Sequence, residues 1–70
     1  MRVKIQVKFV FYLKSGKTFE TITTTDKDEL LIITSYIKKC LNADAPGCVK
    51  LGDCVVRLSD VSVADWEELE

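Results

Sequence analysis

The stretch Arg2–Lys14, RVKIQVKFVFYLK, decides the fold of this chain. Apolar side chains occupy every second position from Val3 to Leu13. Most of the positions between and beside them are basic or polar: Arg2, Lys4, Gln6, Lys8 and Lys14. A repeat of two residues is typical of a β-strand with one buried face and one face in water. The stretch therefore predicts a first strand over residues 3–13.

A turn and a second strand follow. Ser15-Gly16 is a turn signal, and the threonine-rich segment 17–24 suits a half-buried strand. A loop of these two residues alone groups Val10, Tyr12 and Phe19 on the face away from the core. A longer loop brings Phe19 to the core instead and moves Ile22 out. The sequence leaves both registers open.

An amphipathic helix is expected next. Thr25 and Asp26 both qualify as its N-cap, because each has an acidic residue three positions later. One apolar stripe recurs at helical spacing and consists of Leu30, Ile33, Ile37, Cys40 and Leu41. The helix is expected to end near Leu41, with Asn42 as a left-handed cap.

The last third of the chain predicts short strands. Segments 48–51 and 54–58 flank Gly52-Asp53, a two-residue hairpin turn that sets Cys48 opposite Arg57. After a bend at Ser59-Asp60, segment 61–66 predicts a further strand. The alternative is a helix capped by Ser62, which its valines and tryptophan disfavour. The acidic tail 67–70 is expected to fray.

Together these elements predict a single α+β domain over residues 1–70, in the order β-β-α-β-β with a fifth strand at the end. The sheet is expected to be mainly antiparallel, with the helix packed on one face. The expected core consists of Val3, Ile5, Val7, Phe9, Phe11, Leu30, Ile33, Ile37, Leu41, Val56 and Leu58.

The charge distribution is uneven although the net charge is −1. Residues 1–20 carry five basic side chains and one acidic, a net of +4, and residues 51–70 carry one basic and six acidic, a net of −5. A basic face that meets nucleic acid is one interpretation. The favoured interpretation is that the basic first strand lies beside the acidic last segment within one sheet.

The cysteines and the N-terminus predict a cytoplasmic protein. Cys40, Cys48 and Cys54 are an odd number without metal-site spacing, so they are expected to be reduced and to pack as small apolar residues. The start of the chain is charged and alternating, unlike a signal peptide, and no stretch approaches a membrane span of about 20 apolar residues.

The sequence holds no recognisable catalytic equipment. It has no histidine to serve as a base or a metal ligand, so no catalytic, cofactor or metal site is expected. Ser15-Gly16-Lys17-Thr18 matches the end of a phosphate-binding loop, but Phe11 stands where that loop needs a glycine. A chain this short buries about 60% of its unfolded surface, which leaves little room for a substrate pocket. We therefore expect a protein that is not an enzyme.

With no catalytic site expected, the sequence favours a function in binding another molecule. The candidate residues mix aromatic, apolar and basic side chains and are Lys4, Lys8, Val10, Tyr12, Phe19 and Trp66. Such a surface suits a protein partner or self-association, and it can also stack nucleic-acid bases. Trp66 is either a lid on the core, the favoured interpretation, or an exposed anchor for a partner.

Three segments carry a resemblance to a group of proteins. They are Phe11–Lys17 (FYLKSGK), Thr25–Leu30 (TDKDEL) and Val56–Ser62 (VRLSDVS). In this pattern the chain resembles small uncharacterised proteins of phages, prophages and mobile elements of Gram-positive bacteria. The resemblance implies two strands, a helix and a closing set of strands in a short accessory protein. It implies no catalytic residue.

Overall fold

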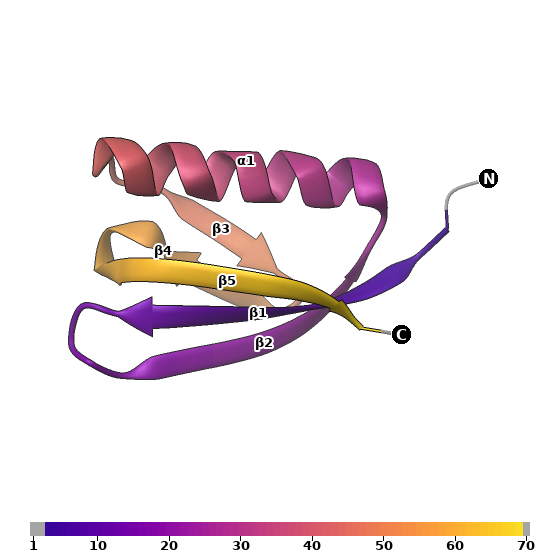
Figure 1. Cartoon of the computed structure of the whole chain (residues 1–70), viewed down its shortest axis with the longest axis horizontal. Coiled ribbons are helices and arrows are strands. Elements are labelled where there is room, and N and C mark those ends of the chain that lie inside the picture. Colours follow the sequence, from indigo (N-terminus) through magenta and orange to yellow (C-terminus); the bar gives the residue numbers. More distant parts are fainter. Residues whose placement is uncertain (1–2, 70) are drawn as a thin grey trace.

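The computed structural model describes residues 3–69, which form five strands and one α-helix (Figure 1). The elements follow one another as β1 (Ile5–Leu13), β2 (Thr18–Thr25), α1 (Lys27–Ala43), β3 (Cys48–Leu51), β4 (Cys54–Arg57), a 3₁₀ turn η1 (Leu58–Asp60) and β5 (Val61–Leu69). The predicted α+β class, the element order and the antiparallel pairing are confirmed.

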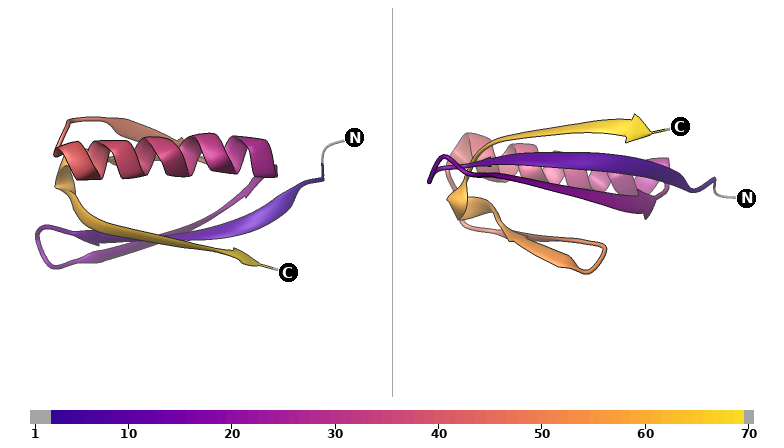
Figure 2. Two further views of the ribbon diagram at one scale, coloured as in Figure 1. Left: turned by 45° about the horizontal axis from the view of Figure 1, so that its top comes forward. Right: turned by 90° about the horizontal axis from the view of Figure 1, so that it is seen from below.

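The strands fall into two antiparallel groups. The first is a three-stranded sheet in the order β2-β1-β5, and the second is the hairpin β3-β4. Helix α1 lies along one face of the three-stranded sheet, and the hairpin lies on its β2 side (Figures 1 and 2). The pairing of β1 with β5 places Lys8 opposite Glu67 and Val10 opposite Asp65. The expectation that the basic first strand lies beside the acidic last segment is therefore confirmed.

The β1-β2 hairpin has the longer of the two loops considered. Leu13 donates its N–H to the Lys17 carbonyl at 2.8 Å, so the loop comprises residues 14–16. Gly16 occupies its last position with φ 93°, a conformation that glycine adopts without strain. Phe11 consequently pairs with Phe19, and Phe19 packs against the core while Ile22 is exposed. The register that puts Phe19 beside Val10 and Tyr12 is wrong.

Both ends of α1 are capped by aspartates. The Asp26 side chain accepts a hydrogen bond of 2.8 Å from the Glu29 N–H, which selects Asp26 over Thr25 as the N-cap. At the other end Asp44, not Asn42, adopts the left-handed conformation, with φ 51°. The Ala45 N–H donates to the Cys40 carbonyl and the Asp44 N–H to the Leu41 carbonyl, which is the Schellman pattern. The helix therefore continues two residues beyond the predicted end.

The core lies between α1, the inner face of the three-stranded sheet and the β3-β4 hairpin. Its buried members are Val7, Phe9, Phe11, Ile37, Cys40, Val49, Leu51, Val56, Leu58 and Val61. Four other residues that were expected in the core pack against it but are only partly buried: Ile5, Leu30, Ile33 and Leu41. Val3 was expected in the core, but it precedes β1 and is 72% exposed, because β5 pairs with β1 only from Gln6 onward.

The β3-β4 hairpin has the predicted two-residue turn, with Cys48 opposite Arg57 and Leu51 opposite Cys54. Alternation along β3 turns Val49 and Leu51 inward and Cys48 outward. The expectation of packed cysteines therefore holds for buried Cys40 and is wrong for Cys48, which is exposed. All three cysteines are free thiols.

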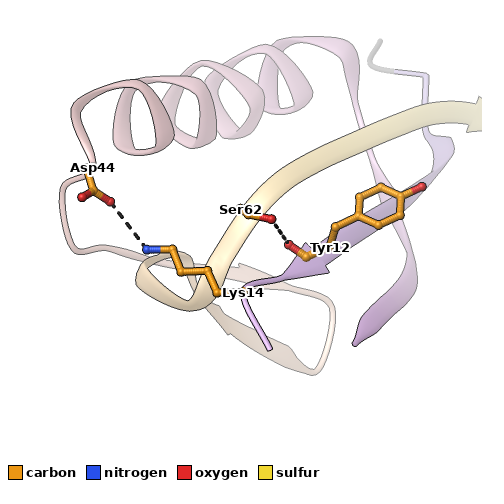
Figure 3. Close-up of polar contacts among 4 residues, drawn as sticks. All are labelled: Tyr12, Lys14, Asp44 and Ser62. Atoms are coloured by element: carbon orange, nitrogen blue, oxygen red, sulfur yellow. Dashed lines mark hydrogen bonds and ion pairs between the residues drawn. The ribbon is translucent and has the colours of Figure 1, made fainter. Parts of the chain in front are cut away.

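Strand β5 confirms the predicted final strand over the helical alternative, and it is longer than expected. Residues 67–69, for which fraying was expected, continue the strand and pair with residues 6–8 of β1. Glu70 lies outside the described residues. A bulge at Ser62 interrupts the alternation, so that Val61 faces the core opposite Leu13 whereas Val63 faces outward opposite Tyr12. The Ser62 hydroxyl donates to the Tyr12 carbonyl at 3.1 Å (Figure 3).

Candidate interaction surface

The face of the three-stranded sheet that points away from α1 is the outer face. Alternation and pairing assign four residues of each strand to it: Gln6, Lys8, Val10 and Tyr12 of β1, Thr18, Glu20, Ile22 and Thr24 of β2, and Val63, Asp65, Glu67 and Leu69 of β5. The helix lies on the opposite side of the sheet (Figure 2). The side chains of the outer face are therefore open to solvent or to a partner.

Several of these side chains are large and apolar. Ile22, Val63 and Tyr12 are 56%, 52% and 42% exposed. Val10 lies half-buried in the central strand, and Leu69 is half-buried at one end. β-branched and aromatic neighbours stabilise a sheet even in water, so part of this surface serves the sheet itself. The rest of the exposed apolar area of Ile22, Val63 and Tyr12 is not covered by any part of residues 3–69.

The outer face carries one lysine and three acidic residues. Lys8 Nζ lies 2.9 Å from Glu20 Oε1, across the β1-β2 pair. The hydrogen bond with Glu20 and the negative charge of Glu20 raise the pKa of Lys8 above 10.5, and the charge of Glu67 adds to the effect. Asp65 and Glu67 form no ion pair with any residue from 3 to 69. The charge excess on this face is therefore negative.

The structure brings some of the six candidate residues together and separates others. Lys8, Val10 and Tyr12 share the outer face, whereas exposed Lys4 precedes β1. Phe19 and Trp66 lie on the inner face, where their rings contact Phe11 at 6.4 Å and Phe9 at 6.2 Å between centroids.

Trp66 is a half-buried lid at the margin of the core, as the favoured interpretation expected. Lys38 of α1 lies 5.6 Å above its ring centre, a cation–π distance that links the helix to β5. The position of Trp66 near the open margin of β5 leaves part of the ring accessible.

The candidate residues chosen from the sequence did not include the outer-face residues of β2 and β5. Ile22 was omitted because its side depends on the loop length, which the sequence left open. Val63, Asp65 and Glu67 were omitted because their place beside β1 depends on the β1-β5 pairing. Alternation along residues 61–69 was the available signal, and the choice between strand and helix obscured it.

Neither a metal-holding cluster nor a phosphate-binding loop is found among the described residues. Within residues 3–69 no three cysteine, aspartate or glutamate side chains are placed to hold a metal ion. Ser15-Gly16-Lys17-Thr18 forms a hairpin turn between two strands, so it lacks the helix N-terminus that a phosphate loop requires. The helix of this part of the chain is too short and too polar to cross a membrane.

Comparison of the chain with protein family models, curated protein sequences and solved structures gave no match. The fold and the outer face therefore define only a general structural class for this chain. It is a small antiparallel α+β domain with one covered and one uncovered sheet face.

Proposed function

We propose that this chain is a non-enzymatic protein-interaction module and that its outer face binds another protein. The observation that carries the proposal is the exposure of Tyr12, Ile22 and Val63 around Val10, on a face that no element of residues 3–69 covers. Tyrosine and apolar side chains bordered by charges are characteristic of protein interfaces.

The charges of the outer face favour a protein over a nucleic acid. A nucleic-acid surface needs lysines or arginines free to contact phosphates. Here Lys8 is engaged by Glu20 at 2.9 Å, and Asp65 and Glu67 would repel a phosphate backbone. We accordingly expect a partner surface that is apolar at its centre and basic at its rim.

The test is affinity capture from cells that naturally express the protein, with three immobilised baits. The first is the native chain, the second is Tyr12→Ser/Ile22→Ser, and the third is Ile32→Ser. Ile32 is a matched control because it is 70% exposed on the helix, away from the outer face. We expect one protein to be retained by the native chain and by Ile32→Ser, with nuclease present, and lost with the double variant.

Sedimentation velocity of the same three proteins completes the test. A dimer that dissociates in the double variant identifies the partner as a second copy of the chain. Equal capture by all three baits, or loss of all bound material after nuclease treatment, contradicts the proposal. Circular dichroism must show that both variants fold.

The biological setting is part of the proposal. A cytoplasmic accessory protein of a phage or mobile element is what the sequence resemblance implies. Three free cysteines, one of them exposed, are consistent with a reducing compartment.

A further inference from the structure

Strand β5 is a free edge of the sheet. Within residues 3–69 it pairs with β1 alone, over residues 6–13, and no other described segment lies beyond it (Figure 2). The opposite edge strand, β2, is different, because the β3-β4 turn approaches it at Gly52 and Thr23. An unpaired edge presents alternate N–H and C=O groups that can receive another strand. With nine residues, β5 is longer than the commonest strand length of about 5–6 residues.

A groove runs beside this edge, between β5 and α1. It has a volume of about 220 Å³ and is lined by Lys27, Leu30, Leu31, Thr34, Trp66 and Glu68. Leu31 is 67% exposed on the groove wall. The volume is below that of ligand pockets, about 300–1,000 Å³, but it suits one or two side chains. A strand added to β5 would direct every second side chain toward this groove, because neighbouring strands align their side chains on each face.

The two sides of the edge differ in charge. On the outer face, β5 presents Asp65 and Glu67, and Lys8, which lies opposite Glu67, is engaged by Glu20. On the groove side, Lys27 and Lys38 outnumber Glu68 and accompany apolar Leu31 and Trp66. An added strand therefore fits best with basic residues on the outer side and apolar residues on the groove side.

A second copy of β5 is a poor occupant of the edge. Antiparallel pairing of two β5 strands would bring Asp65 and Glu67 of both copies to one face of the joined sheet. Like charges on neighbouring strands destabilise the pairing. The acidic residues therefore select against self-association at this edge and in favour of a cationic segment.

We propose that the β5 edge binds an extended segment of another protein in which lysine or arginine alternates with apolar residues, and that this segment adds a fourth strand to the sheet. Backbone hydrogen bonds to β5 supply affinity, Asp65 and Glu67 select the basic residues, and the Leu31–Trp66 groove receives the apolar ones. This binding does not depend on contacts of the outer-face side chains Tyr12 and Ile22.

The probe is a fluorescent peptide of alternating lysine and valine, as long as β5. Its affinity is measured by fluorescence anisotropy in about 50 mM salt, where surface charges are weakly screened. One control peptide replaces an adjacent central lysine and valine with proline and carries one extra terminal lysine, so that the charge is kept and one N–H donor is lost from each edge of the added strand. We expect the parent peptide to bind and the proline peptide to bind at least about tenfold more weakly.

Two matched pairs of protein variants localise the binding. Asp65→Asn/Glu67→Gln should weaken it about tenfold, whereas Glu29→Gln/Asp53→Asn, with the same charge change elsewhere, should not. Leu31→Lys should weaken it more than Ile32→Lys, because Ile32 is equally exposed but does not line the groove. Tyr12→Ser/Ile22→Ser should leave it unchanged, which separates this proposal from that for the outer face.

Three results would overturn the proposal. They are failure of the parent peptide to bind in low salt, equal binding of the proline peptide, and equal effects of the edge variants and their controls. Amide hydrogen exchange gives an independent check, because alternate β5 amides should become protected when the parent peptide binds.

Discussion

The phenol oxygen of Tyr36 lies 2.6 Å from the position that a Cβ atom on Gly47 would occupy. The Cys40 sulfur is 3.0 Å from the same position, so no side chain fits at Gly47 without a shift of its neighbours. The Gly47 carbonyl also accepts a 2.7 Å hydrogen bond from the Leu58 N–H. This close approach joins the C-terminal half of α1 to the start of β3 and to η1.

Gly47→Ala should lower the free energy of unfolding by about 1–3 kcal/mol, because the added methyl group overpacks the contact. Urea denaturation followed by circular dichroism measures the change. In a Tyr36→Phe background the same substitution should cost less, since the phenol oxygen is gone. Equal costs in the two backgrounds would show that the Tyr36 hydroxyl is not the obstacle.

Asp44→Gly should stabilise the protein by about 0.5 kcal/mol. Asp44 holds a left-handed conformation, φ 51°, that glycine adopts without a steric penalty. The substitution also removes the ion pair between Asp44 and Lys14, whose charged atoms are 3.6 Å apart (Figure 3). Both side chains are largely exposed, so that pair contributes about 0.2–0.5 kcal/mol, less than the relief of strain.

Thermal unfolding measures the effect of Asp44→Gly, and Lys14→Gln provides the control. Lys14→Gln removes the same ion pair and keeps the aspartate, so it should lower the melting temperature slightly. A lower melting temperature for Asp44→Gly than for Lys14→Gln would show that relief of the backbone strain at Asp44 does not outweigh the loss of the ion pair.

Trp66→Ala should destabilise the fold by about 2 kcal/mol. Full burial of a tryptophan makes its truncation cost about 3–5 kcal/mol, and Trp66 is half-buried over Phe9. The control is Val63→Thr on the outer face of the same strand, which keeps a β-branched side chain and should change stability by under about 0.5 kcal/mol. Chemical denaturation followed by circular dichroism compares the two. Similar small losses would show that Trp66 does not cover the core.

Local signals in the sequence predict the element order. The alternation from Val3 to Leu13 defines β1, and Gly52-Asp53 fixes the β3-β4 register, because a two-residue turn allows only one pairing. Asp26 and the acidic residues after it predict the start of α1. Each signal is contained within a few residues, so no tertiary information is needed to interpret it.

The face occupied by Phe19 was not predictable with the same certainty. A two-residue loop, 15–16, and a three-residue loop, 14–16, both end at Gly16, and a shift of one residue moves every β2 side chain to the other face. The left-handed conformation of Gly16 in a three-residue loop decides between them. The grouping of Val10, Tyr12 and Phe19 on the outer face was therefore one of two possible registers, and it is not the one observed.

The acidic character of the outer face depends on contacts between distant parts of the chain. Charge complementarity predicted that the last segment lies beside β1, and β5 does so. It could not predict which residues meet, since the Ser62 bulge sets the register at the start of β5. Nor could it predict that Glu20 would engage Lys8 from the other side.

The pair formed by Lys8 and Glu20 makes a prediction about pH. Glu20 raises the pKa of Lys8 above 10.5, first through their hydrogen bond and then through its charge. Because the pKa of Lys8 is higher in the folded state, the stabilisation by the pair is fully present below about pH 10.5 and is lost as the pH rises through the folded-state pKa. Glu20→Gln should lower the pKa of Lys8 toward 10.5, as measured by NMR titration of its side-chain carbon resonances.

Glu67 provides the internal control for this titration. It affects Lys8 only through its charge, and less than Glu20 does, so Glu67→Gln should shift the pKa of Lys8 in the same direction by a smaller amount. A larger shift in Glu67→Gln would mean that Lys8 pairs with β5 in solution. Lys8 would then neutralise part of the acidic edge, and the selection of a cationic strand by Asp65 and Glu67 would be weakened.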